Sequence, residues 1–249
     1  MIIQIYEIQR PEEALRLIEM GVDHIGSVLL PDSFEKNEEL FETIRLIQQY
    51  GKKSSLIPLF TKRDRILEAL EEYHPDIIHF CDDISHIDDF RAINGFQKEI
   101  RQYFPYIAIQ RAIPIHVPGK ANAKKILDMA RQLEETTDFF LTDTLPEPDK
   151  DTALVPQSGF VGITGQICDW HVAAQLVQKS RIPVILAGGL APENVKEAIL
   201  QTKPYGVDSC SATNIKDEKG AYIRFQKDMS AVEAFIQNAR AVMGIDETV

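Results

Sequence analysis

Short apolar runs rich in β-branched residues alternate with longer amphipathic stretches along the whole chain. The short runs have the composition of buried parallel strands, and the stretches between them repeat apolar positions at helical spacing. This alternation predicts repeated βα units rather than a β-sandwich or a helical bundle. The eight expected strands are Ile2–Tyr6, His24–Leu29, Ser54–Phe60, Asp76–Phe80, Tyr106–Arg111, Asp138–Thr142, Pro183–Ala187 and Gly206–Cys210.

A helix is expected after each strand. Gly21 and Gly51 follow the first two helices, where a glycine commonly takes the left-handed conformation that ends a helix, and Asp169 is a good N-cap for the sixth. The expected helices are Pro11–Met20, Glu38–Tyr50, Asp64–Tyr73, Asp89–Tyr103, Ala121–Glu134, Asp169–Lys179, Pro192–Gln201 and Ser230–Met243. No low-complexity segment or linker interrupts the series, so residues 1–249 are expected to form one (β/α)8 TIM barrel of the α/β class.

Composition and charge limit the size of the domain and the kinds of partner that the protein can bind. The 249 residues, 44% of them hydrophobic, are enough for one large α/β domain. A formal charge of -11 disfavours a nucleic acid or an anionic membrane as partner, because both would be repelled. The N-terminus has no basic segment followed by an apolar one, so a cytoplasmic protein is expected. The three cysteines show no CxxC spacing, which predicts reduced thiols and no structural metal site.

The segment from Pro183 to Ser211 has the pattern of a phosphate site. A β-branched strand leads through Gly188 and Gly189 towards a helix expected to open at Pro192. The next strand ends in small polar residues, among them Ser209 and Ser211. Glycines allow the backbone to approach an anion closely, and free N–H groups beside a helix N-terminus favour negative charge. The loops after the last two strands of a βα barrel are a frequent phosphate site. A Gly-Gly pair can also be only a tight βα connection, and spacing alone leaves both interpretations open.

Specific segments are similar to a known family. They are Ile5–Ala14, Gly21–Gly26, Asp138–Thr144, Gly162–Gly165, Asp169–Trp170, Pro183–Val195 and Pro204–Ser211. In these segments the chain resembles phosphoribosylanthranilate isomerase, and the likeness spans nearly the whole sequence. The resemblance implies a TIM barrel, a role in tryptophan biosynthesis, a small phosphorylated substrate, no cofactor or metal, and a monomer or homodimer.

The resemblance also implies roles for individual residues. The family reaction is an Amadori rearrangement, in which a general acid opens the ribose ring and a general base removes the proton from C2. Asp143 matches the family's acid. The residues implied for phosphate binding are Gly165, Gly188, Gly189, Ser209 and Ser211.

The chain departs from the family where the chemistry takes place. Tyr6 replaces the cysteine that serves as the family's base, and an ordinary tyrosine pKa near 10 makes it a poor base at neutral pH. Glu7 replaces the following glycine, and Glu35 replaces the arginine that suits the anthranilate carboxylate. On the fourth strand, His79 lies two residues before the family's histidine position, which Cys81 occupies.

Residues two apart on a strand share a face, so Tyr6, His79, Cys81 and Asp143 are expected to point into the barrel near its C-terminal rim. One interpretation is a rebuilt acid–base site with His79 or Glu7 as base and Asp143 as acid. The other is that His79 is a hydrogen-bonded core residue and Tyr6 fills a vacated pocket. A metal site is disfavoured, because Asp82 falls on the opposite face from His79 and Cys81.

One further residue and one further segment could contribute to the site. Arg111 ends the fifth strand and is expected either to face an anionic ligand or, more commonly, to pair with an acidic side chain. The turn from Asn214 to Phe225 is longer than the family's equivalent and lies beside the expected phosphate loop.

Two functions are therefore compatible with the sequence. The first is an isomerase that acts on a phosphorylated sugar derivative by acid–base proton transfer. The alternative is a non-catalytic barrel that binds a phosphorylated ligand. Retention of Asp143 favours the enzyme, whereas loss of the cysteine and the arginine favours a binding protein or a different substrate.

Overall fold

Eight parallel strands form a closed barrel in a computed structural model that describes residues 1–31, 36–145, 159–162 and 164–243. Each strand pairs with its neighbour in sequence, and β1 pairs with β8 to close the barrel. The strands are β1 (Ile2–Ile5), β2 (His24–Leu29), β3 (Lys53–Pro58), β4 (Ile77–Phe80), β5 (Ala108–His116), β6 (Phe139–Leu145), β7 (Val184–Leu186) and β8 (Gly206–Ser209). The fold is the (β/α)8 TIM barrel that the sequence predicts.

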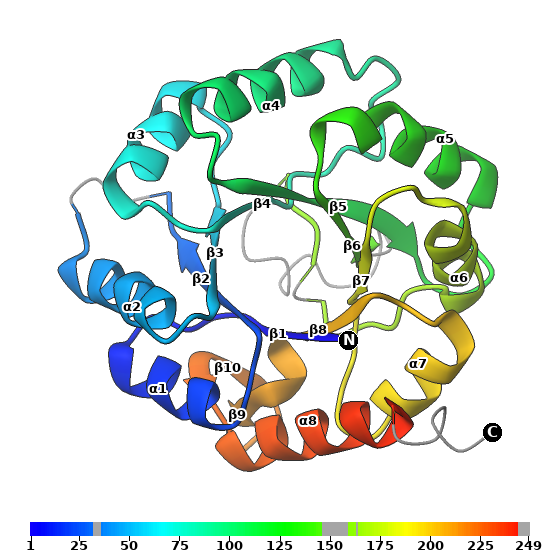
Figure 1. The fold of residues 1–249 in the computed structure, drawn as a ribbon. Coiled ribbons are helices and arrows are strands. Elements are labelled where there is room, and N and C mark those ends of the chain that lie inside the picture. The colour runs from blue at the N-terminus through cyan, green and yellow to red at the C-terminus, as the bar shows by residue number, and fades with distance from the viewer. Residues whose placement is uncertain (32–35, 146–158, 163, 244–249) are drawn as a thin grey trace.

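Helices surround the barrel, one after each strand (Figure 1). They are α1 (Pro11–Glu19), α2 (Glu38–Gln49), α3 (Arg63–Tyr73), α4 (Arg91–Tyr103), α5 (Ala123–Leu133), α6 (Trp170–Lys179), α7 (Val195–Thr202) and α8 (Met229–Met243). Gly21 and Gly51 take positive φ angles of 84° and 70°, and the Asp169 side chain accepts N–H bonds from His171 and Val172, as expected of helix ends. Within the described residues no helix is long and apolar enough to cross a membrane.

Two strands continue past their expected ends. The prediction stopped β5 at Arg111 and β6 at Thr142, but their pairing extends to His116 and Leu145. The mutual pairing satisfies backbone groups over this stretch, which local composition does not reveal. Most of the loop that follows β6 lies outside the described residues.

Helix α7 begins three residues later than predicted. It starts at Val195 rather than Pro192, because Asn194 folds the preceding loop into a turn. Asn194 Oδ1 accepts the Ala191 N–H at 2.9 Å, and its Nδ2 donates to the Gly189 carbonyl at 3.0 Å. These bonds hold the loop after β7 in a turn, and α7 begins directly after it.

The segment predicted as a turn between Asn214 and Phe225 is instead an antiparallel hairpin. Its strands are β9 (Asn214–Lys216) and β10 (Tyr222–Lys227), and they follow the short 3-10 helix η3 (Ser211–Thr213). The hairpin lies beside β1, between α1 and α8 (Figure 1). An extra pair of strands is therefore placed next to the C-terminal end of the barrel.

Candidate active site

A cavity of about 270 Å³ opens at the C-terminal end of the barrel. Its walls come from the ends of the strands and the loops that follow them, where TIM barrels place their active sites. Every site residue that the sequence predicts lines this cavity: Tyr6, Glu7, His79, Asp143, Gly165, Gly188, Gly189, Ser209 and Ser211. The fold thus brings together residues from both halves of the chain.

The loop after β7 is tightly built around glycine. Gly188 and Gly189 have φ angles of 88° and 66°, a conformation that other residues rarely take. A Cβ on Gly188 would lie 2.5 Å from Thr144 Oγ1, and a Cβ on Gly189 would lie 2.6 Å from the backbone of Gln166. Gly165 also has a positive φ, of 63°. Because these positions carry no side chain, a ligand can approach the backbone closely here.

The serines after β8 differ in their availability. Ser209 is buried, and its hydroxyl donates to the Leu190 carbonyl at 2.9 Å, so it ties the end of β8 to the loop after β7. Ser211 begins the turn η3 and is partly exposed to the cavity. Ser209 thus supports the loop, and the partly exposed Ser211 lines the cavity beside it.

Tyr6 fills the position directly after β1. Its ring packs on Gly26, where a Cβ would come within 2.0 Å of it. Its hydroxyl lies 2.6 Å from Ser55 Oγ and 2.8 Å from His79 Nδ1. Burial raises the pKa of Tyr6 well above its ordinary value. Tyr6 is therefore a fixed, neutral side chain of the barrel interior.

His79 faces Tyr6 rather than open solvent. Burial, with Arg111 as a second cause, lowers the pKa of His79 to about 3, so the imidazole is neutral at physiological pH. Its Nε2 is buried and has no hydrogen-bond partner within the described residues. As a base, such an imidazole is weak, because the protonated form is strongly disfavoured in this environment.

Asp143 lies on β6 and points into the cavity. Burial raises its pKa to about 7, although the Thr144 N–H donates to Oδ1 at 2.8 Å. Gly162 lies against its carboxyl group, and a Cβ there would come 2.1 Å from Oδ2. A carboxyl group with a pKa near neutrality can both give and take a proton at physiological pH.

Asp208 is a cavity residue that the sequence reasoning missed. It lies on β8, and burial, reinforced by Asp143, raises its pKa to about 8. Gln4 Nε2 donates to Asp208 Oδ1 at 3.1 Å, and Gln4 Oε1 lies 3.1 Å from His24 Nδ1. An acidic residue within an otherwise apolar barrel strand was the available signal, since such residues are costly to bury without a role.

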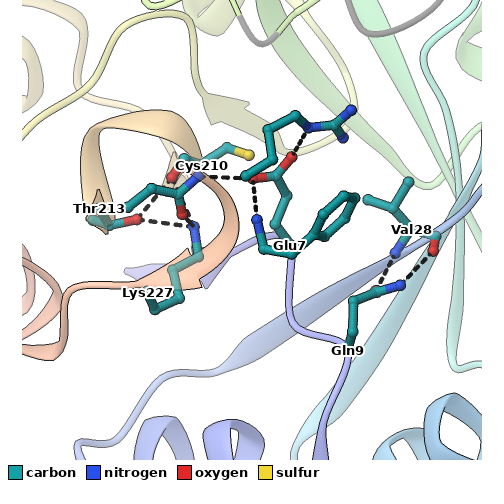
Figure 2. Close-up of polar contacts among 9 residues, drawn as sticks. Glu7, Gln9, Val28, Cys210, Thr213 and Lys227 are labelled. Carbon is teal, nitrogen blue, oxygen red and sulfur yellow. Dashed lines mark hydrogen bonds and ion pairs between the residues drawn. The ribbon is translucent and has the colours of Figure 1, made fainter. Parts of the chain in front are cut away.

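Glu7 is held by the hairpin rather than left free as a base (Figure 2). Its Oε1 accepts Arg224 Nε at 2.6 Å, and its Oε2 accepts Asn214 Nδ2 at 2.8 Å. Burial alone would raise the pKa of Glu7, but Arg224, Lys227 and Asn214 bring it below the ordinary value. Glu7 keeps the positive φ, 67°, at the position where the family has glycine. This geometry argues against Glu7 as the base.

Lys227 completes the same buried cluster (Figure 2). Its Nζ donates to the Cys210 carbonyl at 2.7 Å, to Asn214 Oδ1 at 2.6 Å and to Thr213 Oγ1 at 3.3 Å. All three donors are used, which is what a buried ammonium requires. Lys227 and Glu7 thereby fasten the hairpin to the ends of β8 and β1.

We expect Arg224→Ala to lower the free energy of unfolding by about 3 kcal/mol, at the low end for a broken buried ion pair because Arg224 is partly exposed. The folded-state pKa of Glu7 lies below its unfolded value, so the pair stabilises the protein above about pH 4.5 and loses this effect as pH falls. Urea denaturation at pH 7 and at pH 4 measures the difference.

The matched control is Arg91→Ala, which removes an exposed arginine paired with Asp89. Exposed pairs contribute little, so its denaturation midpoint should match that of the unchanged protein. Equal effects of the two substitutions would contradict the role given to the Glu7 cluster.

Three other residues singled out from the sequence have no proposed part in proton transfer. Arg111 is buried and forms an ion pair with Asp82 at 2.6 Å, so the pairing expected for it is confirmed, although not at an exposed rim. Cys81 lines the cavity, but burial raises the pKa of its thiol far above the ordinary value. Glu35 lies outside the described residues.

Comparison with known sequences identifies the family. The profile of the family described as N-(5'phosphoribosyl)anthranilate (PRA) isomerase matches residues 98–238. The chain belongs to the phosphoribosylanthranilate isomerase family. N-(5'-phosphoribosyl)anthranilate isomerase 2 of Methanosarcina mazei is 29% identical over 96% of this chain and 94% of that protein. The isomerase of Methanocella arvoryzae is 34% identical over 58% of this chain, an alignment that spans 56% of that relative.

Solved structures of phosphoribosylanthranilate isomerases share the fold. The enzyme of Pyrococcus furiosus has a TM-score of 0.67 at 24% identity, covering 97% of this chain and 100% of that one. The enzyme of Thermotoga maritima has a TM-score of 0.69 at 22% identity, with the same coverage. A further structure of the isomerase, with a TM-score of 0.67 and 20% identity over 97% of this chain and 100% of that one, is a complex with reduced 1-(o-carboxyphenylamino)-1-deoxyribulose 5-phosphate.

Proposed function

We propose that this barrel is an acid–base isomerase of a phosphorylated sugar derivative, in which an amino-aldose phosphate is converted to the ketose. Asp143 is the proposed acid, and the loops around Gly165, Gly188, Gly189 and Ser211 are the proposed phosphate site, supported by Ser209. The family membership supports this reaction class, and the solved complex with a reduced, phosphorylated amino-deoxyribulose supports the ligand class.

The observation that carries the proposal is the shared cavity of Asp143 and the glycine loop. A phosphate bound at Gly188 and Gly189 places the sugar within the cavity that Asp143 lines. The raised pKa of Asp143 keeps part of its population protonated near neutral pH, as a general acid requires. A barrel that only bound phosphate would have no need for a buried carboxyl group beside the anion, because the two negative charges oppose each other.

The substrate is proposed to differ from phosphoribosylanthranilate at the end remote from the phosphate. Glu35 opposes a carboxylate, and the Tyr6 ring occupies the position of the family's cysteine. An N-substituent without a carboxylate is therefore favoured over anthranilate.

The proposal is tested with two adducts of ribose 5-phosphate, one with aniline and one with anthranilate. Each is incubated with the protein, and formation of the amino-ketose is followed by NMR. Turnover of the aniline adduct, faster than that of the anthranilate adduct, is expected. Stabilisation by both adducts in a thermal-shift assay without turnover of either would instead indicate the non-catalytic binding protein.

We expect Gly189→Ala to weaken phosphate binding by at least tenfold, because the added Cβ clashes with the Gln166 backbone at a positive φ. Titration with inorganic phosphate, followed by thermal shift, measures the loss. Gly95→Ala is the control, since Gly95 lies in α4 with open space around it. Unchanged phosphate affinity in Gly189→Ala would contradict the placement of the anion.

A further inference from the structure

Tyr6 and His79 line the cavity but are poor proton acceptors. The Tyr6 hydroxyl is committed to Ser55 and His79, and burial raises its pKa. His79 is neutral, and burial makes its protonated form unfavourable. Neither residue therefore replaces the missing cysteine as a base.

Glu7 and the two cavity cysteines are excluded as the base for different reasons. Glu7 is an ionised carboxylate, but both of its oxygens are occupied by the hairpin. The thiols of Cys81 and Cys210 have pKa values raised by burial, so their thiolates are scarce at neutral pH. Two carboxyl groups, those of Asp143 and Asp208, are left in the described part of the cavity.

Asp143 and Asp208 each have an oxygen that is free to meet a ligand. Asp143 accepts the Thr144 N–H on Oδ1, and Asp208 accepts Gln4 Nε2 on Oδ1. Among the described residues, the Oδ2 atom of neither aspartate receives a hydrogen bond. The two residues lie on β6 and β8, on either side of β7 and its glycine loop. A sugar held at that loop therefore lies between them.

Two buried side chains, Gln4 and His24, set the orientation of Asp208 through hydrogen bonds. His24 is buried, and burial lowers its pKa to about 4, so its ring is neutral. With His24 Nδ1 donating to Gln4 Oε1, the Gln4 amide must turn its N–H towards Asp208. Gln4 is thus a positioning residue that holds the Asp208 carboxyl group towards the cavity.

We propose that Asp208 is the partner of Asp143 in proton transfer and supplies the base that the family's cysteine provides and Tyr6 does not. This inference rests on the proposed isomerase function. In the reactive form the pair holds one proton, which lies on Asp143, and Asp208 is ionised; because the pKa of Asp208 is the higher of the two, this is the less populated of the two one-proton forms.

The step balances with these two groups alone. Asp143 gives its proton to the ring oxygen as the C1–O bond breaks, and the nitrogen lone pair forms a C1=N bond. Asp208 then takes the proton from C2, and the C2–H electrons form the C1=C2 bond of the enolamine. Asp208 returns that proton to C1 while the enol hydroxyl gives its proton to Asp143, which yields the ketose and restores both groups.

The shared cavity also couples the two ionisations. Burial is the main cause of the raised pKa of each, and the charge of Asp143 raises that of Asp208 further, whereas Lys227 lowers it. Two carboxyl groups that interact in this way titrate as a pair.

The first test reads the carboxyl groups directly, by NMR titration of protein labelled with ¹³C at the aspartate carboxyl carbons. Asp143→Asn removes the neighbouring charge and should lower the pKa of Asp208 by about one unit. Asp128→Asn, an exposed change on α5, should leave it in place. An Asp208 pKa at the ordinary value, or one that does not respond to Asp143→Asn, would overturn the shared proton.

The second test measures turnover of the aniline adduct of ribose 5-phosphate. Asp208→Asn should lower kcat by about 10²–10⁴-fold with little change in KM, and should remove one limb of the pH profile. Gln4→Leu, which leaves Asp208 without its positioning bond, should lower kcat less. Full activity in Asp208→Asn would overturn the role of Asp208 but not the proposed isomerase function. If the unchanged protein is inactive, the proposed function is wrong, and the NMR titration still tests whether Asp143 and Asp208 share a proton.

Discussion

Replacing Tyr6 by cysteine together with Glu35 by arginine should raise kcat/KM for phosphoribosylanthranilate by about 10²–10⁴-fold, the range for gain of one acid–base group. The cysteine restores the family's base, and the arginine restores a cation for the anthranilate carboxylate. That range is for the cysteine alone, and the arginine, which acts on binding, should raise kcat/KM further. The decay of phosphoribosylanthranilate fluorescence measures the gain.

The structure indicates that replacing Tyr6 by cysteine lowers the stability of the protein. The Tyr6 ring packs on Gly26, and truncating a buried aromatic side chain costs about 3–5 kcal/mol. Thermal unfolding must therefore show that the double variant is folded at the assay temperature. Tyr6→Phe with Glu35→Arg is the control, because it keeps the ring and supplies no base. A gain of equal size in the control would contradict the role given to the cysteine.

Asp143→Asn, made in the background of Tyr6→Cys and Glu35→Arg, should lower kcat for phosphoribosylanthranilate by about 10²–10⁴-fold. The amide has the size of the carboxyl group but cannot deliver a proton to the ring oxygen. Inorganic phosphate should bind with equal or higher affinity, since the phosphate site lies on the loops after β7 and β8 and the substitution removes a carboxyl group beside it.

Asp143→Glu should fail to restore the activity. The longer side chain must find room beside Gly162, whose own Cβ position already lies 2.1 Å from Asp143 Oδ2. If Asp143→Asn kept full activity, or lost phosphate binding together with activity, the assignment of Asp143 as a proton donor would be wrong.

The barrel could be predicted from local pattern because each βα unit carries its own signal. Strand β2 was predicted with its observed bounds, His24–Leu29, in a segment flanked by Asp23 and Pro31. The ends of β5 and β6 could not be predicted, because their last residues are strands only through pairing with each other. Helix α7 was placed too early, because the turn that Asn194 builds depends on contacts with Gly189 and Ala191.

The composition of the cavity could also be predicted, but not the state of its groups. Alternation along the strands was enough to place Tyr6, His79 and Asp143 inside. The commitment of Glu7 to Arg224 could not be predicted, because the two residues are 217 positions apart and meet only through the hairpin. Asp208 was missed although its acidic side chain on a barrel strand was a signal; its bond to Gln4, from the opposite end of the chain, could not be predicted.

The kcat/KM of the unchanged protein for phosphoribosylanthranilate tests most directly the claim that this family member acts on a different phosphorylated sugar. Fluorescence decay of that substrate with the purified protein gives the value. The account predicts little or no activity, below about 10⁴ M⁻¹s⁻¹, because the Tyr6 ring takes the position of the family's cysteine and Glu35 opposes the anthranilate carboxylate. A value in the ordinary enzyme range of about 10⁴–10⁸ M⁻¹s⁻¹ would contradict it.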